Sequence, residues 1–233
     1  MKLKNIFFTL FFLTNLTALH SQNGIITYKT KRTKIRKTSN PEMTRKITEE
    51  VNRSSYVLNF NKEKSFFKKV KNIPLYPFES KFADISTGAN KNWYQFNGIN
   101  KDAMYNTEIL SKQYIVNDSS RMKEWEFFNE IKIIDGYTCY KAVNKKLNTR
   151  SGNYITNIAW YTTDIPLPYG PIGNGGLPGL ILKLEIDNFY YLVDKIILNP
   201  KEIKKIPSLK KGKNIDINEK IRLMRDVRKV TID

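Results

Sequence analysis

The sequence predicts a mainly β protein, built as a curved antiparallel sheet (open or half-barrel-like) with a short C-terminal helix. Short segments rich in β-branched and aromatic residues recur along the chain, separated by turn-forming Asn, Asp, Gly and Pro residues. The alternating strand and helix patterns typical of a parallel-sheet enzyme are absent. The 233 residues fit one domain, and 40% of them are hydrophobic, which is enough to bury a core.

The N-terminal residues have the layout of a secretory signal peptide. Lys2 and Lys4 precede a mostly apolar, uncharged run from Ile6 to Leu16, and small and polar residues follow up to Ser21. The apolar run is shorter than the roughly 20 residues that a membrane span needs. We therefore expect residues 1–21 to be a signal peptide and the protein to be exported, periplasmic or secreted.

The histidine count limits the chemistry that is available. Cleavage after residue 21 would remove His20, the single histidine, and lower the formal charge from +18 to +16. Without imidazole, Ser-His-Asp and Cys-His catalysis and histidine-ligated metal sites are excluded. Clustered carboxylates at calcium-loop spacing and a phosphate-binding Gly-Lys-Ser/Thr motif are also missing. We expect no catalytic residue, no metal and no cofactor, with a His-free hydrolase as the enzymatic alternative.

Turn signals separate the strands of the first half. The residues at 61–64 predict a hairpin turn, and Asn97-Gly98 predicts another turn. The basic, threonine-rich stretch 29–46 also permits a solvated strand, because charged and neutral residues alternate there. The stretch 71–92, interrupted by two prolines, is expected to be irregular. The strands expected in this half are 24–28, 54–61, 65–70, 93–96, 103–110 and 113–116.

The second half continues the strand pattern. Asp135-Gly136 is a type I′ turn signal between strands 125–134 and 137–143. Three further strands are expected at 154–162, 180–186 and 189–198. One face of the strand 125–134 has the apolar residues Trp125, Phe127, Ile131 and Ile133.

Near the end of the expected single domain, residues 22–233, the strand pattern gives way to a linker and a helix. A basic linker is expected at 200–217, followed by a helix at 218–230 with Asn218 as its N-cap. Apolar residues at helical spacing should pack this helix on the sheet; they are Ile221, Met224 and Val227.

The lone cysteine, Cys139, cannot form an internal disulfide and lies in a strand pattern. Because an exposed thiol is a liability in an oxidising compartment, we expect Cys139 to be a buried structural residue. Trp125 is also expected to be structural.

The stretch from Ala159 to Leu182 has five of the 11 glycines and four of the nine prolines. Proline prevents ladder pairing, and glycine permits positive φ, as Gly176 or Gly179 could adopt. This pattern predicts a strand, a rigid glycine-rich loop and a second strand. Aromatic residues beside such a loop could line a groove.

Within this stretch, Gly176-Leu177-Pro178-Gly179-Leu180-Ile181 resembles the name-giving motif of the GLPGLI family of secreted Bacteroidetes proteins. The similarity extends upstream through the Trp-Tyr-Thr segment at 160–162, to the Cys139 strand, to Trp125 and to the opening at Gly24. The resemblance implies export and supplies no catalytic residue, since the family has no established activity. The family motif and possible binding loop comprise Trp160, Tyr161, Pro166, Leu167, Tyr169, Gly170, Pro171, Gly176, Leu177, Pro178, Gly179, Leu180 and Ile181.

The leading functional hypothesis is a non-enzymatic envelope protein that binds or carries a hydrophobic ligand or a protein segment. A deep apolar groove would favour a carrier, an acid or Ser-Lys cluster in a cleft would favour the hydrolase, and a flat exposed aromatic patch would favour an accessory partner of an outer-membrane receptor. The basic surplus suggests an anionic outer-membrane surface as another partner. Nucleic acid is not expected, because exported proteins rarely meet it.

Overall fold

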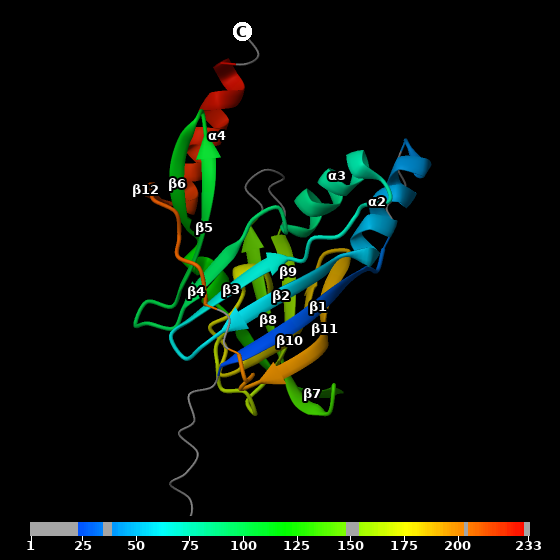
Figure 1. Ribbon diagram of the computed structural model, residues 1–233, viewed down its shortest axis with the longest axis vertical. Coiled ribbons are helices and arrows are strands. Elements are labelled where there is room, and N and C mark those ends of the chain that lie inside the picture. Colours follow the sequence, from blue (N-terminus) through cyan, green and yellow to red (C-terminus); the bar gives the residue numbers. More distant parts are fainter. Residues whose placement is uncertain (1–22, 35–38, 148–153, 203–204, 231–233) are drawn as a thin grey trace, which may run out of the picture.

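The computed structural model describes residues 23–34, 39–147, 154–202 and 205–230 (Figure 1). The expected signal peptide, residues 1–21, lies outside the described residues.

Twelve strands form one open sheet in the order β12-β6-β5-β4-β3-β2-β1-β11-β10-β9-β8-β7 (Figure 1). All neighbouring strands are antiparallel except β12, which runs parallel to β6. The strands are β1 (Gly24–Arg32), β2 (Ser55–Phe60), β3 (Lys64–Lys69), β4 (Trp93–Phe96), β5 (Asp102–Ile109), β6 (Lys112–Asn117), β7 (Glu126–Ile134), β8 (Tyr137–Leu147), β9 (Tyr154–Thr162), β10 (Leu180–Ile186), β11 (Phe189–Leu198) and β12 (Lys213–Asp216). The predicted fold class is confirmed, and each expected strand is present.

Two of the helices were not expected. Helix α2 (Pro41–Arg53) begins inside the stretch 29–46, for which a strand was an alternative, so that alternative is correct up to Arg32 and wrong from Pro41 onwards. The side chain of Asn40 caps it, because its Oδ1 accepts a hydrogen bond from the backbone N–H of Met43 at 2.9 Å, and Pro41 begins the first turn.

Helix α3 (Pro77–Thr87) corrects the prediction that 71–92 is irregular. Pro77 stands at the start of the helix, where its missing N–H costs nothing, so this proline begins a helix and does not interrupt one. Gly88 ends the helix with φ at 73°, a left-handed conformation that glycine adopts without strain. Two short 3₁₀ turns, η1 (Ser119–Met122) and η2 (Pro171–Gly173), complete the described elements.

The C-terminal helix α4 (Ile217–Val230) is present at the predicted position, but its N-cap and its packing differ from the prediction. Its cap is Asp216, whose Oδ1 accepts from the N–H of Asn218 at 2.7 Å and of Glu219 at 2.8 Å, so Asn218 is not the cap. Val227 packs on the core as expected, whereas Met224 is exposed. The predicted linker also contains β12, and the helix lies along β5 and β6 (Figure 1).

Aromatic rings fill the centre of the core. The ring of Tyr56 stacks on Phe67 at 5.5 Å and meets Tyr191 edge-on at 4.9 Å, and all three residues are fully buried. These residues come from β2, β3 and β11, so strands far apart in sequence share one aromatic cluster.

Candidate functional site

The glycine-rich loop is part of the core. Leu167 is 4% exposed and Tyr169 is fully buried, so neither side chain can line a groove open to solvent. Within the predicted motif set, Pro166 and Pro178 are exposed and Gly176 is half-buried. The remaining members are buried: Trp160, Tyr161, Leu167, Tyr169, Gly170, Pro171, Leu177, Gly179, Leu180 and Ile181.

Hydrogen bonds within the loop fold it against the following strand. The N–H of Leu180 donates to the carbonyl of Ile165 at 3.0 Å, and the N–H of Ile181 donates to Tyr169 at 3.0 Å. The hydroxyl of Tyr28 donates to the carbonyl of Ile181 at 2.7 Å. These hydrogen bonds hold the loop against the core beside β10.

Gln95 anchors the loop, and sequence reasoning missed it. Its Nε2 donates to the carbonyl of Asn174 at 2.8 Å, and its Oε1 accepts from the N–H of Gly170 at 3.2 Å and from the Ser65 hydroxyl at 2.9 Å. The side chain is fully buried. One sequence signal could have revealed Gln95, since it is a polar residue within the aromatic strand Trp93–Phe96. A buried amide in such a strand needs hydrogen-bond partners nearby.

Two glycines of the motif are required for different steric reasons. Gly176 has φ at +81°, and a Cβ there would lie 1.9 Å from the carbonyl oxygen of Met122. Gly179 has no positive φ, but its Cβ would lie 1.8 Å from the carbonyl oxygen of Thr162. Of the two glycines for which positive φ was considered, Gly176 alone adopts it.

Cys139 is fully buried, as predicted. Burial, together with the nearby carboxylate of Asp164, raises the pKa of the Cys139 thiol to about 11. The thiol is therefore protonated at neutral pH, which suits a structural residue. Trp125 is partly buried against the core and donates its indole N–H to Gly175.

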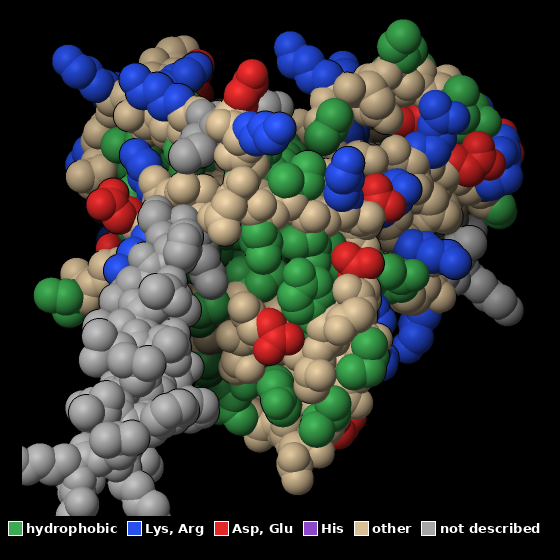
Figure 2. All heavy atoms as spheres, turned by 60° about the horizontal axis from the view of Figure 1, so that its bottom comes forward, with side chains coloured by type: hydrophobic (Ala, Val, Ile, Leu, Met, Phe, Trp, Pro, Cys, Tyr) green, Lys and Arg blue, Asp and Glu red, His purple; other side chains and the backbone are tan. Residues whose placement is uncertain are grey.

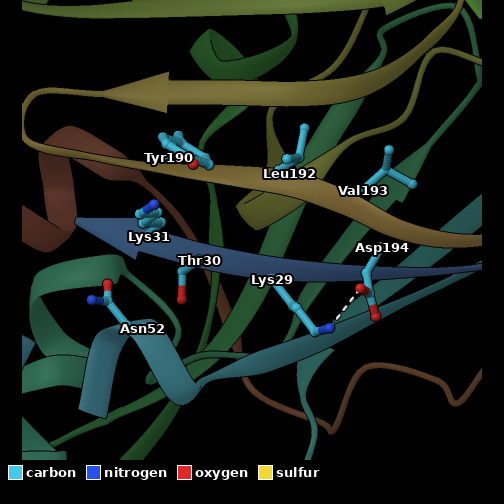
Figure 3. Close-up of a pocket in the computed structure, with 8 residues that line it drawn as sticks. All are labelled: Lys29, Thr30, Lys31, Asn52, Tyr190, Leu192, Val193 and Asp194. Atoms are coloured by element: carbon cyan, nitrogen blue, oxygen red, sulfur yellow. Dashed lines mark ion pairs between the residues drawn. The ribbon is translucent and has the colours of Figure 1, made fainter. Parts of the chain in front are cut away.

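A pocket of about 360 Å³ lies on the outer face of β1 and β11, beside the end of α2 (Figure 3). Lys29 and Asp194 in this pocket form an ion pair at 2.6 Å, and the hydroxyl of Thr30 donates to the carbonyl of Val51. Because these polar groups bond to the protein itself, they offer little to a polar ligand. A second cavity of about 530 Å³ lies between the outer face of β3–β6 and the segment at 207–210.

The end strand β7 exposes apolar side chains on both of its faces. The exposed fractions are 61% for Phe127, 42% for Phe128, 60% for Ile131 and 64% for Ile133. Figure 2, which brings this end of the molecule forward, shows hydrophobic side chains gathered there. The apolar stripe predicted on this strand is therefore present, but the protein's own core does not cover it.

The backbone of β7 is irregular at one point. Its register against β8 shifts between Phe128 and Ile131, and the stretch from Ile131 to Ile134 pairs regularly with the strand from Tyr137 to Tyr140. Glu130 in the bulge forms an ion pair with Lys141 at 2.7 Å. Bulges and charges of this kind discourage the edges of identical molecules from pairing with each other.

Among the described residues, no group of three His, Cys, Asp or Glu residues could hold a metal ion. No helix in the described part of the chain is long and apolar enough to cross a membrane.

Comparison with known families gives one match. The family described as "Protein of unknown function (Porph_ging)" matches residues 144–183. This segment comprises β9, the glycine-rich loop and the start of β10, together with the end of β8. No curated protein matches the chain.

Two solved structures of PNGF-II, in space groups C2 and P21, are similar in fold. They give TM-scores of 0.56 and 0.54 at 16% and 17% sequence identity. Each match covers 88% of this chain, which spans 33% and 34% of the PNGF-II chains. At this identity the likeness concerns the fold alone.

Proposed function

We propose that this protein is exported to the cell envelope and binds an extended segment of a partner protein along β7, without catalysing a reaction. The observation that supports this most strongly is the set of four apolar side chains exposed on β7. The GLPGLI resemblance and the signal-peptide pattern support export.

The two ends of the sheet differ in a way that supports strand addition. At one end, the chain's own C-terminal segment adds β12 in parallel to β6, pairing Lys213 with Tyr114 and Asp216 with Asn117. At the other end, no strand lies beyond β7 among the described residues. A strand with unpaired backbone groups on its outer side is a template for an added strand.

The side chains of β7 give such a partner apolar contacts. Phe127, Ile131 and Ile133 pair with Ala142, Tyr140 and Thr138 of β8, which places them on one face of the sheet. The ring of Phe127 also meets Tyr161 at 6.2 Å, so this surface continues into the core aromatics. An extended segment with apolar residues at alternate positions would bury them.

A protein segment is a better occupant than a small hydrophobic ligand. The residues expected to line a groove, Leu167 and Tyr169, are buried, whereas the apolar side chains of β7 are exposed along the edge strand. In the PNGF-II structures the matching region is about a third of the chain, so this fold also occurs joined to further protein.

Site-specific photocrosslinking in an envelope extract tests the proposal. A benzophenone amino acid at Ile133 should crosslink to one partner segment, whereas the same probe at the fully exposed Ile99 should not. A synthetic peptide of the captured segment should bind the wild-type protein and protect β7 amides from hydrogen exchange. Ile131→Lys together with Ile133→Lys should weaken peptide binding by about tenfold or more, because a lysine cannot be buried in an apolar contact without cost.

Crosslinking to lipid alone, or equal capture of the segment at Ile99, would contradict the proposal. So would unchanged peptide affinity of the folded double variant.

A further inference from the structure

Three cationic side chains converge where α4 meets the sheet, around a single described carboxylate. Lys91 precedes β4, Arg121 lies in η1 and Lys220 lies in the first turn of α4. Each is partly exposed, so solvent ions can reach it. The carboxylate is Asp118, which bonds to the Nε of Arg121 at 2.7 Å. The cluster therefore has three formal positive charges and one negative charge.

Two aromatic rings form the floor of this cluster. The Nζ of Lys91 lies 4.4 Å from the centre of the Tyr105 ring, and the Nζ of Lys220 lies 5.4 Å from the same centre. The guanidinium of Arg121 lies 4.4 Å from the centre of the Trp93 ring. The centres of the two rings are themselves 4.5 Å apart, so all three cations contact one pair of adjoining aromatic rings.

The arrangement is electrostatically unfavourable without a further negative charge. The Nζ atoms of Lys91 and Lys220 lie near the same Tyr105 ring, so their positive charges repel each other. Burial, followed by the charges of Lys220 and Arg121, lowers the pKa of Lys91 to about 7, and burial also lowers the pKa of Lys220. Lys220 stands in the first turn of a helix, where the helix dipole disfavours a cation and favours an anion.

We infer that Lys91, Lys220 and Arg121 form a binding site for a small oxyanion of the phosphate or sulfate class. An oxyanion between the lysines would accept charge-assisted hydrogen bonds from both ammonium groups. It would also offset the repulsion between the two lysine charges with two favourable ion pairs. The inference is independent of the function proposed for β7.

The site would join two parts of the molecule. Lys220 belongs to α4, whereas Lys91 and Arg121 belong to the segments beside β4 and β5. A bound oxyanion would therefore hold the first turn of α4 against the sheet. Binding should protect the amides of this turn from hydrogen exchange.

The experiment compares melting temperatures in sodium phosphate, sodium sulfate and sodium chloride at equal ionic strength. The wild type should melt at a higher temperature in phosphate or sulfate than in chloride. Lys91→Met and Lys220→Met should each lose most of this difference and weaken phosphate affinity by about tenfold or more, because each removes one charge-assisted hydrogen bond. Lys112→Met removes an exposed charge from β6, and this control variant should keep the difference in melting temperature between the salts.

A second arm distinguishes free oxyanions from lipid phosphates. Vesicles of phosphatidylglycerol should compete with phosphate if the site takes a lipid headgroup, and should not compete if it takes the free ion. Either result supports the site.

Hydrogen exchange on the wild type keeps the inference testable if a lysine variant fails to fold. Phosphate should slow exchange in the first turn of α4 more than chloride does at equal ionic strength. Equal melting temperatures of the wild type in all three salts, or an equal phosphate effect in Lys91→Met and Lys220→Met, would overturn the inference.

Discussion

The indole N–H of Trp125 donates a hydrogen bond to the carbonyl oxygen of Gly175 at 2.9 Å. The bond joins the residue that directly precedes β7 to the glycine-rich loop, across 50 positions of sequence. The start of the exposed edge strand is thereby fixed to the buried loop. A disturbance of the loop should therefore reach the start of β7, and the integrity of the loop is the first property to test.

Replacing Gly176 or Gly179 with valine should destabilise the protein by about 3 kcal/mol or more, because a side chain at either position overlaps a backbone carbonyl. The melting temperature measures the effect. Gly98→Val is the matched control, since nothing lies within 4 Å of a Cβ there. Gly136→Val isolates the conformational cost, because Gly136 has φ at +79° and open space. Equal losses at Gly98 and Gly176 would contradict the steric argument.

Gln95→Leu should destabilise the protein by about 2–4 kcal/mol, because it leaves the N–H of Gly170 and the carbonyl of Asn174 without their side-chain partner in the core. Chemical denaturation measures the loss. Gln113→Leu, at an exposed position, provides the control and should change stability by less than about 0.5 kcal/mol. A similar stability for both variants would show that the Gln95 bonds do not hold the loop.

Cys139 should resist thiol reagents in the native state, since it is fully buried and its pKa is raised to about 11. Labelling should become fast only when the protein unfolds. The native state retains the thiol proton between the ordinary pKa of 9.0 and about 11, so the contribution of this group to stability falls as pH rises through that window. Cys139→Ala should cost about 1 kcal/mol. Fast labelling of the native protein would contradict burial.

Lys91→Met should stabilise the protein in phosphate-free buffer, and the gain should depend on pH. The pKa of Lys91 is about 7 in the folded protein and 10.5 in its ordinary state, so the unfolded chain binds more protons between these values. The contribution of Lys91 to the free energy of unfolding of the wild type therefore rises as the pH rises from about 7 to 10.5.

The gain from the substitution should be largest near pH 6–7, on the order of 2 kcal/mol after allowance for solvent screening, and should shrink towards pH 10. The other charged groups of the cluster, Lys220, Arg121 and Asp118, are present in both proteins, and burial raises the pKa of Tyr105 above this window. Unfolding free energies at several pH values check the prediction. A gain independent of pH would show that lost packing, and not the Lys91 charge, accounts for the change.

Local patterns in the sequence were sufficient for every strand except β12, which lies in the predicted linker, and for several turns. The alternation of apolar and polar residues along β10 and the Asp135-Gly136 turn depend only on neighbouring residues, and both positions are confirmed. Helix α2 was missed because the alternation of charged and neutral residues in 29–46 suggested a solvated strand, and helix α3 was missed because Pro77 was taken as an interruption. Pro41 and Pro77 each stand at a helix start, which the Asn40 cap or the Gly88 stop could have indicated.

By itself, the sequence determined the fold class, the burial of the lone cysteine and the constrained glycine-rich loop between two strands. Side-chain period, composition and backbone sterics fix these properties locally. The tertiary structure alone decided that Gln95 meets a loop 75 positions away, that Gly176 and not Gly179 takes positive φ, and that Lys91 and Lys220 lie near one ring. It also decided which strand remains at the edge, since the strand order places β7 last. Such properties depend on which distant segments pack together, and local patterns do not specify that choice.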